Sequence, residues 1–148
     1  MISFTLSENN FIPLQREYTI IKVDNLNFER NKNYVLDSIH NFNSEIKWDN
    51  MFTLEESKNR VFNNMRMYIG LIDSEVFGHV WFKDYNDGVY LFNLFVKNNT
   101  TNKTYTGTEF TSDIINRFET QYPIYADVDD WNVKSIRLFK KLGFTITN

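Results

Sequence analysis

The loop between Phe95 and Gly107 collects polar side chains directly before a segment with the pattern of a helix. The first backbone amides of a helix have no partner within it, and together with the helix dipole they suit an anion such as a phosphate group. Lys103 would add a cation to such a site. Taken alone, the Asn- and Thr-rich run 98–102 is an ordinary loop that enters a helix. The pattern therefore leaves two interpretations open, an anion site and a plain turn.

A second segment of interest, 126–144, combines a polar strand end with a short amphipathic helix. Asp130 or Asn132 can cap this helix, because their side-chain oxygens accept hydrogen bonds from free amides at a helix start. Gly143 is placed to end it. The apolar stripe of the helix is Ile136, Phe139 and Leu142. By itself, the segment requires no ligand.

The composition argues against several kinds of chemistry. The chain of 148 residues has no Cys and two His, so we expect no thiol nucleophile, disulfide or metal site, and we assign His40 and His79 to surface or structural roles. A net charge of −3 argues against nucleic-acid binding through phosphate neutralisation. Neither a signal peptide nor a membrane-spanning run is visible. We therefore expect a cytoplasmic protein that binds neither nucleic acid nor membrane.

Periodicity predicts the elements that must position the two segments. Strands are expected at 18–23, 67–72, 76–82, 89–96, 124–128 and 144–147, and helices around 35–42, at 54–64, at 107–118 and after residue 132. Thr53 and Glu56 form a capping box before the second helix. Asp73-Ser74-Glu75 and Asn86-Asp87-Gly88 are predicted to turn the chain within an antiparallel meander. This order predicts a mixed α/β (α+β) fold, in a single domain over 1–148.

The segment 126–144 resembles a cofactor segment of the GCN5-related N-acetyltransferase (GNAT) family, in which a strand, Asn, two residues and Ala or Ser precede an apolar helix ending in Lys-Leu-Gly-Phe. The loop before Gly107 resembles the family's other cofactor segment, with Asn102 in place of a basic residue and Tyr105 in place of the first Gly. The resemblance covers residues 67–144. It implies a mixed central sheet of about six or seven strands with a splayed pair, flanked by about four helices.

The resemblance also implies which residues serve the site. The acetyl-CoA-binding residues would be Phe95, Val96, Asn102, Lys103, Thr104, Tyr105, Thr106, Gly107, Thr108, Asn132, Ser135 and Phe139. Asp127 stands where some family members carry a carboxylate that acts as the base. Asn93 occupies another of the family's base positions, but an amide cannot accept a proton at neutral pH. Phe139 stands where many members have a Tyr that protonates the leaving thiolate.

The implied activity is transfer of an acetyl group from acetyl-CoA to a primary amine, by direct attack of the amine on the thioester. The acceptor would be a protein N-terminus, an amino sugar or a small amine, and the resemblance leaves a homodimer open. The alternative is a catalytically silent member that binds coenzyme A or a protein partner, as Phe139 and Tyr105 indicate. A plain α/β binding domain outside the family is a third hypothesis.

The two ends of the chain complete the expected sheet. After Phe144 only four residues follow, so the C-terminal hairpin of the family is expected to be missing or shortened. Ile2, Phe4 and Leu6 alternate with polar residues near the N terminus. We therefore expect this segment, or a partner chain, to cover the exposed edge of the sheet.

Overall fold

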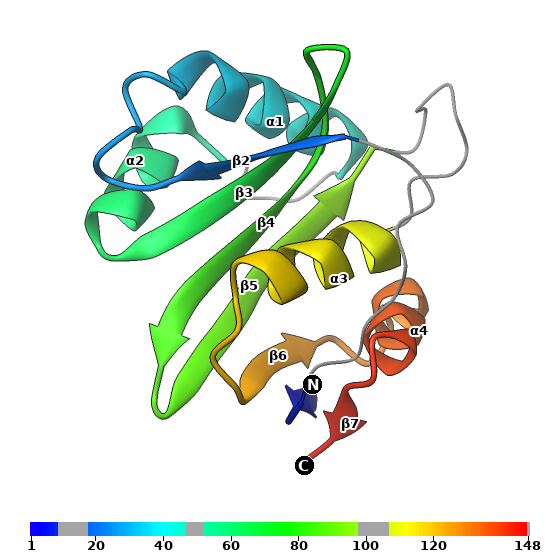
Figure 1. Ribbon diagram of the computed structural model, residues 1–148. Helices are drawn as coiled ribbons and strands as arrows, with labels where there is room; N and C mark the ends of the chain where they lie inside the picture. The colour runs from blue at the N-terminus through cyan, green and yellow to red at the C-terminus, as the bar shows by residue number, and fades with distance from the viewer. Residues whose placement is uncertain (9–17, 47–51, 98–106, 148) are drawn as a thin grey trace.

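The computed structural model describes residues 1–8, 18–46, 52–97 and 107–147. The strands are β1 (Ile2–Leu6), β2 (Thr19–Val23), β3 (Met65–Ile72), β4 (Glu75–Tyr85), β5 (Gly88–Val96), β6 (Ile124–Val128) and β7 (Thr145–Ile146). The helices are α1 (Lys32–Glu45), α2 (Leu54–Phe62), α3 (Gly107–Arg117) and α4 (Val133–Lys141). Across the described residues, these seven strands form one mixed sheet in the order β2-β3-β4-β5-β6-β1-β7, with four helices around it (Figure 1). The predicted α/β fold class is thereby confirmed.

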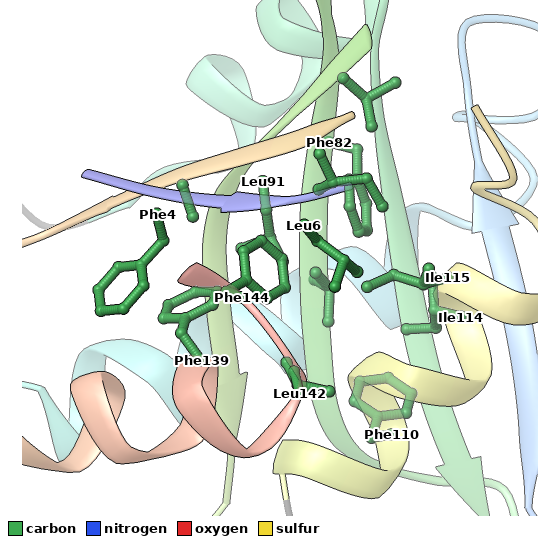
Figure 2. Packing of buried hydrophobic residues seen from close by; sticks show 14 of the residues in the cluster. Phe4, Leu6, Phe82, Leu91, Phe110, Ile114, Ile115, Phe139, Leu142 and Phe144 are labelled. Carbon is green, nitrogen blue, oxygen red and sulfur yellow. The ribbon is translucent and has the colours of Figure 1, made fainter. Parts of the chain in front are cut away.

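The sheet has a separate apolar core on each face. On one face α1 and α2 cover β3 and β4, and Phe42, Trp81 and Phe95 are buried there. On the other face α3 and α4 pack over β5, β6 and β1, as the side chains in Figure 2 show. Only β5 and β6 run parallel to each other among the described strand pairs, because α3 forms the crossover between them. The predicted meander and crossover therefore both exist.

Both turns of the meander differ in detail from the prediction. Asp73 and Ser74 have φ values of 51° and 65°, and Glu75 already belongs to β4, so the loop has two residues rather than three. Two successive positive φ values give the hairpin a twist that matches its strands. In the second turn the positive φ belongs to Asn86, at 50°, and not to the Asp-Gly pair. Gly88 is required instead by its close approach to the backbone of Pro123.

The predicted caps of α2 and α4 are confirmed, whereas α2 ends at Phe62 rather than at residue 64 and α1 is longer than predicted. The amide of Ser135 donates to Asn132 Oδ1 at 3.2 Å, so Asn132 is the cap of α4. Gly143 has a φ of 95°, which favours glycine directly after a helix. At α2, the amide of Glu56 donates to Thr53 Oγ1 at 3.1 Å. Local hydrogen bonding thus sets where both helices begin.

The N-terminal strand lies inside the sheet rather than at its edge. β1 pairs along its whole length with β6, from Ile2 opposite Val128 to Leu6 opposite Ile124, and the two-residue β7 pairs with its other side. Phe4 is 1% exposed and stacks on Phe139 at a centroid distance of 5.6 Å. The expectation that this segment covers the exposed edge of the sheet is confirmed, because β1 pairs with β6.

Replacement of Phe4 by Ala should lower the free energy of unfolding by about 3–5 kcal/mol, because it leaves a cavity between β1 and α4. Urea unfolding followed by circular dichroism measures this loss. Phe62, which is 54% exposed on α2, supplies a matched control: Phe62→Ala should cost less than about 1 kcal/mol. Equal, small losses for both variants would contradict the packing of β1 against α4.

Candidate functional site

β5 and β6 pair over only part of their length. Their register contains two pairs, Val89 with Ile124 and Tyr90 with Tyr125. β5 then continues to Val96 and β6 to Val128 without further pairing between them. The facing backbone groups of the two strands are therefore not joined in this stretch, and we call the region between the unpaired parts of β5 and β6 the slot. This is the splayed pair that the resemblance to the family implies.

Gly88 closes one end of the slot. A Cβ atom built on Gly88 would lie 1.9 Å from the carbonyl oxygen of Pro123, so only glycine allows this approach. The same carbonyl accepts a hydrogen bond from the amide of Val89 at 3.1 Å. The contact brings the start of β6 against the start of β5, so the two strands pair here and separate beyond Tyr90.

A β-bulge lies in the part of β5 that does not pair with β6. Trp81 of β4 pairs with Asn93, but the next residue, Phe82, pairs with Leu91, which leaves Phe92 as an extra residue. Bulges re-aim side chains and are common next to active sites. Phe92 contacts the α2 side of the sheet through Arg60, and Asn93 contacts β4 on the same face through His79. Two consecutive residues of the splayed strand thus point to one side.

The start of α3 lies against the open end of the slot. A Cβ atom on Gly107 would lie 2.7 Å from Leu138 of α4 and 3.9 Å from both Leu94 and Val96 of β5. The small residue therefore lets the first turn of α3 approach β5 and α4 together. Thr108 is buried in the same turn. The first amides of α3, which have no partner within the helix, thus border the slot, as the anion-site interpretation requires.

The predicted cofactor residues occupy different layers. Val96 is half-buried beside Gly107, whereas Phe95 is buried on the other face against Phe42. Ser135 is half-buried in the first turn of α4. Phe139 is 4% exposed. The predicted residues Asn102, Lys103, Thr104, Tyr105 and Thr106 lie outside the described part of the chain. The structure thus brings Val96, Gly107 and Thr108 together at the slot.

Phe139 forms part of the core between α4 and the N-terminal strand. Its ring lies 5.6 Å from Phe4 and 5.0 Å from Phe144, measured between centroids. Phe139 has no hydroxyl, so it cannot protonate a leaving thiolate as a Tyr at this position would. The ring therefore packs α4 against β1.

Asp127 lies on the face of β6 opposite α3 and α4. The buried neighbours Ala126 and Val128 point to the core, so the carboxylate of Asp127 points away from it. Its two oxygens accept hydrogen bonds from the hydroxyls of Ser3 at 2.6 Å and Tyr90 at 2.9 Å. Burial, and then Asp127, raises the pKa of Tyr90 to about 12, so this phenol remains a donor at neutral pH. The carboxylate is thus held across the slot, between β5 and β1.

A buried polar chain on the same side escaped the sequence prediction. Ser38 of α1 contacts His79 Nδ1 at 2.6 Å, and His79 Nε2 contacts Asn93 Oδ1 at 2.7 Å. An amide oxygen can only accept, so Nε2 carries the proton and Nδ1 accepts from Ser38. Burial lowers the pKa of His79 to about 4, so the ring is neutral at pH 7. The assignment of His79 to a structural role is consistent with this chain, which fixes Asn93 beside the bulge.

Other features of the described residues lie away from the slot. A surface cavity of about 480 Å³ is lined by residues of β2, β3, β4 and the end of α2, with none from β5 or β6. Among the described side chains, no group of three or more His, Asp or Glu is arranged to hold a metal ion. No described helix is long and apolar enough to cross a membrane.

The chain belongs to the acetyltransferase (GNAT) family, whose model matches residues 33–144. An acetyltransferase from Thermus thermophilus has a TM-score of 0.68 at 15% identity, with 88% of both chains covered. The PaiA N-acetyltransferase from Thermoplasma acidophilum, solved in complex with coenzyme A, has a TM-score of 0.61 at 16% identity, over 89% of this chain and 92% of that one. These structures share the fold described above.

A third similar structure is an aminoglycoside acetyltransferase from an uncultured soil metagenomic sample, solved in complex with trehalose. Its TM-score is 0.62 at 14% identity, over 84% of this chain and 86% of that one. No curated protein matches the sequence. Identities this low establish a common fold, and the residues of the site must be judged on their own geometry.

The buried neutral His79 predicts a specific pH dependence of stability. The unfolded side chain has a pKa near 6.5, so between about pH 6.5 and pH 4 the unfolded chain binds a proton that the folded chain does not. The contribution of neutral His79 to the free energy of unfolding is complete above pH 6.5. It is lost as the pH falls towards 4, by about 3 kcal/mol in total. Denaturant unfolding at a series of pH values should show a shallower slope in this range for His79→Gln.

His40 provides the control, because it is exposed on α1. His40→Gln should keep the slope of the wild type. NMR titration of the His79 ring in the wild-type protein gives an independent measurement. Protonation of this ring near pH 6.5 in the folded state would contradict the buried chain.

Proposed function

We propose that this protein is an acetyl-CoA-dependent N-acetyltransferase that acetylates a primary amine. The observation that carries the proposal is the slot between β5 and β6, because only two residue pairs join these strands before they separate. The start of α3 borders the open end, and a bulge lies on the splayed strand. A protein N-terminus, an amino sugar or a small amine would serve as the acceptor.

The described residues fit an extended cofactor with a negatively charged end. Gly107 and Thr108 begin α3, and their amides, which have no partner within the helix, would stabilise a pyrophosphate. Val96 and the unpaired edge of β5 would line the middle of the slot, and Ser135, on the first turn of α4, would border it. The loop residues Asn102, Lys103, Thr104, Tyr105 and Thr106 would complete the phosphate end, with Lys103 as the cation.

When bound, acetyl-CoA supplies the thioester whose carbonyl carbon the amine attacks. Asp127 would take the proton that the amine loses, since its carboxylate lies on the face of β6 opposite α3 and α4. The hydroxyls of Ser3 and Tyr90 orient that carboxylate. A backbone amide at the bulge would polarise the carbonyl, as oriented donors do in acyl transfer. The leaving thiolate would take its proton from solvent, because a thiol has a pKa of roughly 8.5.

Calorimetry with acetyl-CoA tests the binding half of the proposal. We expect saturable binding to the wild-type protein, measured as the heat of titration. The absence of binding at millimolar acetyl-CoA would reject both the enzyme and the coenzyme-binding form of the silent alternative.

Replacement of Asp127 by Asn tests the catalytic half. An Asn side chain keeps an oxygen that accepts hydrogen bonds but cannot take a proton. We expect kcat/KM for acetylation of an amine panel to fall by about 100-fold or more, with unchanged affinity for acetyl-CoA. Asp129→Asn makes the same change in charge at an exposed position, and its activity should match the wild type. Full activity in Asp127→Asn would assign the base elsewhere.

One observation favours the silent alternative. Phe139 is buried between Phe4 and Phe144, so the family's usual proton donor is replaced by a core residue. A silent member would bind acetyl-CoA in the calorimeter but acetylate no amine of the panel. The two experiments together therefore separate an enzyme from a binding protein.

A further inference from the structure

Arg60 of α2 lies in a pocket of aromatic rings next to the bulge. Its guanidinium carbon is 4.7 Å from the ring centroid of Phe52, 5.1 Å from Phe92 and 5.7 Å from Trp81. The side chain of Arg60 remains 19% exposed, and Phe92 is 40% exposed. The cation is thus surrounded by rings but still reaches solvent beside the splayed strand.

The guanidinium of Arg60 has no hydrogen-bond acceptor within the described part of the protein. Its nearest carboxylate is Glu56, 3.7 Å from Nη2, and Nη1 is buried without a partner. The buried indole nitrogen of Trp81 also lacks an acceptor. Desolvated donors of this kind are costly unless a partner is supplied. Burial accordingly lowers the pKa of Arg60.

Arg66 shows how a structural arginine of the same protein is satisfied. Its Nε and Nη2 atoms donate to the buried carboxylate of Glu119 at 2.6 and 2.5 Å, and Nη1 donates to Asp84 at 3.0 Å. Arg60 has the same five donors and none of these bonds. The difference indicates that a bound molecule supplies the hydrogen-bond acceptor for Arg60.

The position of Arg60 indicates what that partner is. Arg60 touches Phe92, the extra residue of the bulge, and Trp81, which pairs with Asn93. It therefore lies on the face of the sheet that also carries Asp127, opposite α3 and α4. In the proposed reaction the amine arrives on this face, so a ligand of Arg60 belongs to the acceptor and not to the cofactor.

We propose that Arg60 binds the carboxylate of the acceptor, and that the acceptor is a small amino carboxylic acid. This inference rests on the proposed acetyltransferase function. A carboxylate matches the planar fork of a guanidinium with two parallel hydrogen bonds. Glu56, 3.7 Å away, disfavours a doubly charged phosphate. Because the guanidinium lies 5.1 Å from the ring centroid of the bulge residue Phe92, we expect the amine and the carboxylate of the acceptor to lie only a few bonds apart.

The test compares amino acids with their primary amides as acceptors, since each pair keeps the amine and differs in the carboxylate. The variants are Arg60→Met, which keeps the apolar stem, and Arg60→Lys, which keeps the charge but loses the fork. Arg30→Met removes an arginine from an exposed position and serves as the control. Thermal melting confirms that each variant folds.

We expect the wild type and Arg30→Met to prefer an acid over its amide in kcat/KM, although the amide has the more readily deprotonated amine. Arg60→Met should reduce this preference by about 10- to 100-fold, and Arg60→Lys should reduce it partly. Acetyl-CoA affinity should not change in any variant. An acid-to-amide ratio that is the same in Arg60→Met and the wild type would overturn the inference.

The proposed function would be rejected if the wild-type protein bound acetyl-CoA but acetylated no acceptor. The carboxylate site would then be tested by a binding measurement. For that case, calorimetry of the same amino acids is carried out with coenzyme A present. Binding that is lost in Arg60→Met and retained in Arg30→Met would support the carboxylate site. Equal binding to both variants, or no binding to the wild type, would overturn it.

Discussion

Two residue pairs hold β5 and β6 together, and the site depends on their separation beyond that point. The contact exists because Gly88 has no side chain to collide with Pro123. From there the strands separate, and a bulge changes the direction of Phe92 and Asn93. A sheet that continued to pair would have engaged the backbone groups of β5 that are not joined to β6 beyond Tyr90.

The two faces of the sheet around this slot have different chemistry. The face of α3 and α4 carries a large apolar cluster, with buried polar side chains of α3 such as Thr111 and Asp113 at its margin and the backbone amides at the start of α3. The opposite face carries the hydrogen-bonded groups of Asp127 and Asn93. A buried carboxylate supports this arrangement, because Glu119 accepts hydrogen bonds from Arg66 and Tyr68 and so ties the end of α3 to β3. Removal of one partner would leave a charge buried and unpaired. The position of α3 is therefore fixed at both ends.

Much of the fold could be predicted because its signals are local. Apolar periodicity located the helices and strands, and Asn132 and Gly143 marked the limits of α4 through backbone chemistry that involves only near neighbours. Two candidates for covering the edge of the sheet remained open, the N-terminal segment and a partner chain. The alternation of Ile2, Phe4 and Leu6 predicts a half-buried strand but does not identify the strand with which it pairs. Pairing with β6 decided between them.

The missed parts of the site depend on residues that are distant in the sequence. A bulge is a mismatch between two strands, so Phe92 alone carries no sign of it. Arg60 meets Phe52, Trp81 and Phe92 only in the folded state. For His79 a signal did exist, because the residue stands within a continuous apolar run in β4, which is typical of a strand buried on both faces. Its contact with Asn93 required the register of β4 and β5.

The central position of β1 also has a consequence for how the chain folds. Ser3 and Asp127 are 124 residues apart in sequence yet hydrogen-bonded, so this half of the sheet closes a very long loop. Contacts of such large sequence separation form slowly, because the loop-closure entropy is lost before the contacts are gained. During synthesis, β1 leaves the ribosome long before β6 exists. The backbone of β1 that pairs with β6 must therefore remain unpaired until Val128 has emerged.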